Sequence, residues 1–330
     1  MSKIEQKTKN ITTESSDLNR IEESRFNKEL DMVIKSSEEM RIKRMMQHRT
    51  RGFIAANLSI LSLLIGVGGF GWFFLMQAQM IPAFSLFLLS LIPPLMMNIW
   101  AGLPLKTYVK EHKTVFMPQL ANALNGLSFH PERGVSRKIL DRLAVLPAFD
   151  EYNAEDCFMG SYKGVKVIFS EARLFSRKQP VFDGIFVLLE TAEDVIDGHT
   201  IITANTKMVK AFAQTRWKTM KPVHVNVEQV WDKFHIYSTA PETAELMIGD
   251  KLLKELAEAA EIFDNAPLTA VMFGKKYIFM SIPYDKDMFE ASNLFVPVTT
   301  KTQALKCKKE IEQLLEIIDV FDLYKPMKTD

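Results

Sequence analysis

The chain has 330 residues and a formal net charge of +1, which leaves room for a membrane segment and one medium-sized domain or two small ones. Its charge is uneven, because residues 1–51 hold 12 Lys or Arg against 9 Asp or Glu, whereas residues 106–330 hold 29 against 31. A strongly basic domain for nucleic acid is not indicated, so we expect no nucleic-acid partner. The two cysteines, Cys157 and Cys307, are too few for a disulfide framework.

The first 51 residues are predicted to lie outside any membrane. Residues 1–15 are rich in Lys, Thr, Ser and Glu and lack apolar periodicity, which predicts a disordered tail. Residues 16–51 place Phe26, Leu30 and Val33 on one side of a helix, with charges elsewhere. At its end, the basic residues either fix the membrane topology or contact anionic lipid, and both interpretations stay open. These lipid-facing candidates are Arg41, Lys43, Arg44, Arg49 and Arg51.

Residues 52–105 contain no Asp, Glu, Lys, Arg or His. A helix crosses the hydrocarbon core of a membrane with about 20 residues, so this run predicts a transmembrane hairpin with spans at 53–76 and 81–103. Lys and Arg flank both outer ends of the hairpin and are missing from its turn. Because positive residues next to a span stay in the cytoplasm, we expect a two-pass protein with both termini cytoplasmic.

Small side chains recur along one face of the first predicted span. Ala55, Ser59, Ser62, Gly66 and Gly69 follow one another at spacings of 4, 3, 4 and 3. Such a stripe lets another helix approach closely. Its partner is either the second span or a neighbouring copy in a homo-oligomer. Since neither span carries an ionisable residue, we expect no ion or proton pathway.

The remainder of the chain is predicted to form a helical stalk, residues 106–148, followed by a cytoplasmic domain, residues 149–330. Alternating apolar residues predict hairpins around 157–169 and 268–282 and a further strand at 181–190. Helical periodicity returns at 243–263 and 301–324. Hairpins and helices without βαβ alternation indicate an α+β fold with an antiparallel sheet and flanking helices.

No catalytic signature is found in the sequence. The six histidines include no pair at a metal-ligand spacing, and no phosphate-binding loop or nucleophile elbow occurs outside the apolar run. We therefore expect no metal, no cofactor and no enzymatic activity. Asp156, Glu171 and Asp183 lie at predicted strand ends, where acids commonly accept backbone donors, although a pair meeting in a cleft could act as acid and base.

A set of residues in this domain resembles the bacterial DUF3137 family over roughly residues 105–325. In chain order these are Asp156, Gly160, Gly164, Glu171, Phe182, Gly184, Phe186, Pro283, Phe289 and Glu290. The resemblance implies a membrane hairpin ahead of the domain, a location in the bacterial inner membrane and association with LemA-like membrane proteins. The family has no established biochemical activity, so the resemblance implies no site.

The sequence therefore predicts a membrane-anchored cytoplasmic binding or scaffolding module that recognises another envelope protein. One alternative is a module that binds anionic lipid through the basic stretch Arg173–Lys178. A third interpretation is a hydrolase that uses the strand-end carboxylates. The expected partners are membrane lipid and an envelope protein, and a homo-oligomer stays open.

Overall fold

The computed structural model consists of two compact units. The first comprises Met1–Phe116 with Ala291–Ala304, and the second comprises Met117–Glu290 with Leu305–Asp330. The residues described are 3–76, 80–123, 127–143, 145–162, 164–191, 198–205, 220–225, 233–286, 288–289, 293–297 and positions 309, 312 and 315, with side chains from residue 28 onward.

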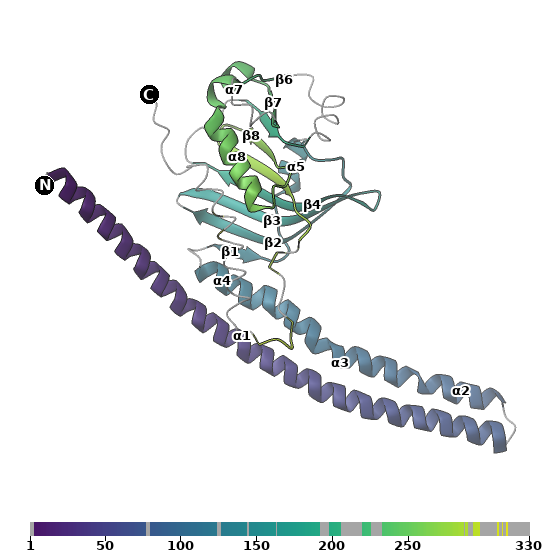
Figure 1. Ribbon diagram of the computed structural model, residues 1–330. Coiled ribbons are helices and arrows are strands. Elements are labelled where there is room, and N and C mark those ends of the chain that lie inside the picture. The colour runs from purple at the N-terminus through teal and green to yellow at the C-terminus, as the bar shows by residue number, and fades with distance from the viewer. Residues whose placement is uncertain are drawn as a thin grey trace. The chain divides into compact units, whose positions relative to one another are not determined.

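The first unit is a helical hairpin with two long arms (Figure 1). One arm is α1, Lys3–Gly71, continued by the π-helical turn η1, Trp72–Met76. The other arm contains α2, Met80–Ser90, α3, Ile92–Glu111, and the π-helical turn η2, His112–Phe116. The second arm is interrupted at Leu91, and the prolines that follow explain the interruption. Proline has no N–H to donate inside a helix, but it is tolerated in the first turn, so a new helix, α3, begins there.

The helix α1 starts much earlier than the sequence suggested. It begins at Lys3, inside the segment expected to be a disordered tail, and runs unbroken into the apolar part of the chain. No Gly or Pro occurs before Gly52, so nothing in the covalent chain interrupts the helix. The described chain contains two helices long and apolar enough to cross a membrane, within Lys28–Met76 and Met80–Ala123.

The second unit is built on a nine-stranded sheet with the order β1-β2-β3-β4-β9-β8-β5-β7-β6, in which all described neighbours are antiparallel. Four helices accompany the sheet in the described part of this unit. The predicted α+β class is confirmed. The strands are β1 Ser128–His130, β2 Glu151–Tyr162, β3 Val165–Ser176, β4 Gln179–Glu190, β5 Thr200–Thr203, β6 Lys221–Pro222, β7 His235–Ser238, β8 Thr269–Phe273 and β9 Tyr277–Pro283; the helices are α4 Met117–Ala123, α5 Arg137–Leu143, α7 Pro241–Met247 and α8 Asp250–Ile262.

The predicted stalk is divided between the two units. Residues up to Phe116 continue the hairpin arm, whereas the sheet unit begins at Met117 instead of residue 149. The strand β1 is paired with β2, and the Phe129 and Phe158 rings lie 4.9 Å apart. A strand of three residues is too short to show alternation, which is why the sequence pattern missed it. The predicted helix 301–324 lies largely outside the described residues.

Both faces of the sheet carry a buried layer. On one face, Leu140 and Leu143 of α5 pack with Leu174, Phe186 and Phe279 from the central strands. On the other face lies α8 (Figure 1), whose Leu253 and Leu256 are buried. Burial on both faces explains the nearly continuous apolar run of β4, which a one-sided sheet would not need.

Candidate functional site

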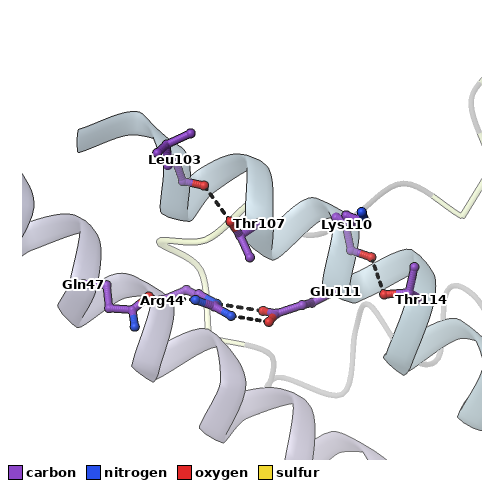
Figure 2. A network of polar contacts seen from close by, with 7 residues as sticks. All are labelled: Arg44, Gln47, Leu103, Thr107, Lys110, Glu111 and Thr114. Atoms are coloured by element: carbon purple, nitrogen blue, oxygen red, sulfur yellow. Dashed lines mark hydrogen bonds and ion pairs between the residues drawn. The ribbon is translucent and has the colours of Figure 1, made fainter. Parts of the chain in front are cut away.

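An ion pair joins the two arms of the hairpin just beyond the apolar run (Figure 2). The Arg44 Nε donates a hydrogen bond of 2.8 Å to one Glu111 oxygen, and Nη2 donates to the other. Arg44 Nη1 also donates to Gln47 Oε1 at 2.8 Å. The hydrogen bond between Arg44 and Glu111 lowers the pKa of the Glu111 carboxyl and raises the pKa of the Arg44 guanidinium. This bidentate pair ties α1 to α3.

Two more contacts continue this connection toward the apolar run. His48 Nδ1 lies 2.8 Å from the Ala101 carbonyl oxygen, and because a carbonyl only accepts, Nδ1 carries the proton. Arg51 Nη1 donates to the Trp100 carbonyl at 3.5 Å, and its guanidinium lies 4.9 Å from the centre of the Trp100 ring. We call these six residues the hairpin base: Arg44, His48, Arg51, Trp100, Ala101 and Glu111.

The small-residue stripe faces the second arm of the same chain. A Cβ at Gly66 would lie 1.9 Å from Ser90 Oγ, and one at Gly69 would lie 2.1 Å from Leu86 Cδ2. Ser62 Oγ donates 2.8 Å to the Ser90 carbonyl. Ala55 is buried and Ser59 half-buried on the same side. The second arm of this chain therefore occupies the stripe, and a neighbouring copy would have to bind elsewhere.

A short segment from late in the chain is attached to α1. We call residues 293–297 the strap. Arg41 Nη1 donates 2.8 Å to the Leu294 carbonyl across 253 positions of sequence, and both Arg41 and Leu294 are buried. Two hydrogen bonds to Glu38 orient the Arg41 guanidinium. The Phe295 ring contacts the His48 ring edge-on at a centroid distance of 5.7 Å.

These contacts revise the set of residues expected to face lipid. Arg41 is buried against the strap, and Arg44 and Arg51 are half-buried in the hairpin base. Of the five candidates, only Lys43 and Arg49 are exposed. Sequence reasoning missed Glu111 and Trp100 as the partners of Arg44 and Arg51, and it missed His48 as a further residue of the hairpin base. The spacing of 4 and 3 between Arg44, His48 and Arg51 was the available signal, because it places them on one helical face.

In the sheet unit, Gly184 permits a close approach of backbone. A Cβ at this position would lie 2.2 Å from the Ile282 carbonyl oxygen and 2.9 Å from the Pro283 Cα. Pro283 is the register partner of Gly184, and the next N–H, that of Tyr284, donates to the Asp183 carbonyl at 3.1 Å. On either side in sequence, the rings of Phe182 and Phe186 stack at 5.0 Å. These motif residues therefore join β4 to β9.

Glu171 and Phe289 fix the segment that follows β9. Glu171 Oε1 accepts the Met288 N–H at 2.8 Å. The buried Phe289 ring lies 4.7 Å from the Phe158 ring, and its backbone has a φ of 56°. Of the other motif residues, Gly160 is paired with Val167 inside the β2–β3 ladder. Gly164 supplies the positive φ of 85° before β3, and Glu290 lies outside the described residues.

The three candidate catalytic carboxylates occupy separate environments. Asp156 is buried in the β-bulge of β2 with a φ of 50°. Asp183 forms an ion pair with Arg173 at 3.4 Å. Arg173 forms a second ion pair, also at 3.4 Å, with Glu155. Glu171 holds the Met288 backbone. Among the residues that the structure describes, no group of three or more His, Cys, Asp or Glu side chains is arranged to hold a metal ion. The row Glu155–Arg173–Asp183 is thus a structural ladder across β2, β3 and β4.

Together, these features define an α+β domain joined to an apolar helical hairpin with a polar base. Residues 180–323 match the family model described as "Protein of unknown function (DUF3137)", which confirms the predicted family for this part of the chain. The match includes Phe182, Gly184 and Phe186 and the motif residues after β9, and it begins after Glu171. No curated protein and no solved structure matches the chain.

Proposed function

We propose that this protein is a two-pass protein of the bacterial inner membrane whose sheet unit serves as a cytoplasmic binding or scaffolding module. The observation that supports it is the surface of the hairpin. Phe53, Leu75 and Ile81 are 74, 75 and 82 % exposed, and many further apolar side chains along both arms are exposed with them. Such a continuous apolar surface requires an apolar environment.

The same surface argues against a buried hairpin in a soluble protein. Of the most apolar stretch in each arm, only 6 % and 11 % is buried. A core helix of a soluble protein would have most of this stretch covered by other elements. The two arms contact each other through small residues and through hydrogen bonds from side chains to backbone carbonyls. Both kinds of contact remain favourable in lipid.

The charges near the base support an orientation with both termini in the cytoplasm. Lys43, Arg49, Lys106 and Lys110 are exposed next to the apolar run, on both arms. The opposite end of the hairpin has no basic residue between Arg51 and Lys106. The positive residues therefore favour keeping the hairpin base on the cytoplasmic side.

A binding role for the sheet unit agrees with the structural roles of its acids. Glu171, Asp183 and Asp156 serve the backbone, an ion-pair ladder and a bulge, respectively, which argues against the hydrolase alternative. A membrane anchor raises the local concentration of a binding module, so weak contacts become sufficient. An envelope protein is the proposed partner, and the family resemblance makes a LemA-like protein the first candidate.

The lipid-binding alternative loses one of the three cations in the stretch Arg173–Lys178. Arg173 is engaged by two carboxylates, so Arg177 and Lys178 at the β3–β4 turn are the exposed cations of that stretch. At about 1 kcal/mol per basic residue near an anionic surface, these two provide about 2 kcal/mol, which is too little for stable binding on their own.

Two experiments test the proposal in order. Carbonate washing and ultracentrifugation of native membranes should leave the full-length protein in the pellet, and its release would contradict the anchor. A photo-crosslinking residue at Leu246, 89 % exposed on α7, should then capture an envelope protein in the native membrane. The matched control carries the same probe at the exposed Lys254 of α8. Capture of lipid or of the protein itself alone would contradict the scaffold role.

A further inference from the structure

The strap exposes two apolar side chains next to the hairpin base. Phe295 is 52 % exposed and Val296 is 50 % exposed, whereas the preceding Leu294 is buried. The hydrogen bond from Arg41 to the Leu294 carbonyl and the ring contact of Phe295 with His48 fix this arrangement. The strap is therefore held against α1 with one apolar residue inward and two outward.

The contacts of His48 give the depth of Phe295 relative to the apolar run. His48 precedes Gly52 by four residues, which is about 6 Å along a helix that rises 1.5 Å per residue. The headgroup layer on each side of a bilayer is roughly 5–8 Å thick. On the other arm, His48 reaches Ala101, which lies inside the apolar run. Phe295, in contact with His48, is thus level with the boundary between headgroups and acyl chains.

We propose that the strap is a third membrane contact, in which Phe295 and Val296 insert at the headgroup–acyl boundary of the bilayer that the hairpin crosses. This inference rests on the proposed membrane hairpin. The contacts of His48 put the exposed Phe295 and Val296 at the level of the bilayer that the arms cross, which commits the strap to lipid as the occupant. Exposed Lys43 and Arg49 are placed to meet anionic phosphates, and aromatic rings with basic neighbours favour this zone.

The strap gives the sheet unit a second link to the membrane surface. The chain leaves the hairpin at Phe116 and forms the sheet up to β9. It then returns to the first unit through the strap. With a single link to the membrane, the sheet unit could rotate freely about that one connection. With the strap in lipid, two points of the chain flanking the sheet strands are attached to the bilayer surface.

Environment-sensitive fluorophores on single cysteines test the inference. The full chain with Cys157→Ala and Cys307→Ala receives Phe295→Cys, Lys35→Cys or Leu64→Cys, each labelled with a nitrobenzoxadiazole dye. The labelled proteins are reconstituted in vesicles of phosphatidylethanolamine and phosphatidylglycerol. Lys35 is exposed and about 26 Å before Gly52 along α1, so it is the water control. Leu64, 64 % exposed in the middle of the first arm, is the span control.

The dye at 295 should be quenched by lipids with a nitroxide near the headgroup and protected from iodide, with a blue-shifted emission relative to the dye at 35. Quenching of the dye at 295 by iodide to the same extent as the dye at 35 overturns the inference. Protection of the dye at 295 from both quenchers also overturns it, because that result indicates a protein occupant. Failure of lipid nitroxides to quench the dye at 64 would instead refute the hairpin. Because Cys157→Ala changes the core, a photo-crosslinker at Phe295 in the otherwise unchanged chain provides a second measurement, and a phospholipid adduct is expected.

Discussion

The Arg44–Glu111 pair provides the sharpest test of the hairpin base. We predict that Glu111→Gln and Arg44→Gln each destabilise the association of the two arms, because each leaves the partner charge without its bidentate contact. The side chains are 21 and 23 % exposed. An exposed pair contributes below about 1 kcal/mol, whereas breaking a buried pair costs about 3–5 kcal/mol. This half-buried, bidentate pair should lie between these limits, with a coupling energy of about 1–2 kcal/mol.

A double-mutant cycle measures this coupling directly. The midpoint of dodecyl sulfate denaturation is determined in mild detergent micelles for the wild type, both single variants and the double variant. The double variant should lose less stability than the sum of the single variants. Lys43→Gln is the matched control, since Lys43 is exposed in the same turn of α1 and should change stability by less than about 0.5 kcal/mol. Additivity of the two substitutions within about 0.3 kcal/mol would refute the reasoning.

The pH dependence of the same pair has a defined sign. The hydrogen bond to Arg44 lowers the pKa of Glu111 in the folded protein. The stabilisation is therefore fully present above the ordinary carboxyl pKa of about 4.3 and is lost as the pH falls through the lower folded value. Glu111→Gln should show no such loss below pH 4 beyond that of the rest of the protein. An unchanged acid limb in the variant would contradict this assignment.

Three further substitutions or treatments have expected outcomes. Gly66→Ala should destabilise the hairpin by about 1–3 kcal/mol, since its Cβ would meet Ser90 at 1.9 Å, whereas Gly68→Ala, with nothing within 4 Å, should be neutral or stabilising in the same detergent assay. Gly184→Ala should lower the thermal midpoint of the sheet unit, at a cost above about 2 kcal/mol, because the added methyl would meet the β9 backbone; Gly249→Ala, in open space, is the control, and equal midpoints would contradict the close approach. Burial raises the pKa of Cys157 to about 12. Iodoacetamide at pH 8 should therefore modify it only in denaturant, as read by peptide mass spectrometry, and its contribution to stability should fall as the pH rises above about 9.

Local patterns in the sequence predicted the elements whose information is contained within a few turns or strands. The absence of charge over 52–105 predicted the two apolar arms, and the alternation around 181–190 and 268–282 predicted β4, β8 and β9. The α+β class followed from the order of these elements. These predictions depend on periods of 2 and 3.6 residues, which every helix or strand imposes on its own segment.

The tertiary structure alone decided which partners the polar residues have. The sequence indicated that Arg41 faces lipid. In the structure Arg41 instead donates a hydrogen bond to the buried carbonyl of Leu294, 253 residues away. Arg44 forms its ion pair with Glu111, 67 residues away, and Glu171 accepts a hydrogen bond from the Met288 N–H, 117 residues away. The start of the sheet unit at Met117 likewise depends on the pairing of β1 with β2. No local period encodes such contacts, because a charge or a carbonyl carries no information about which distant segment will approach it once the chain is packed.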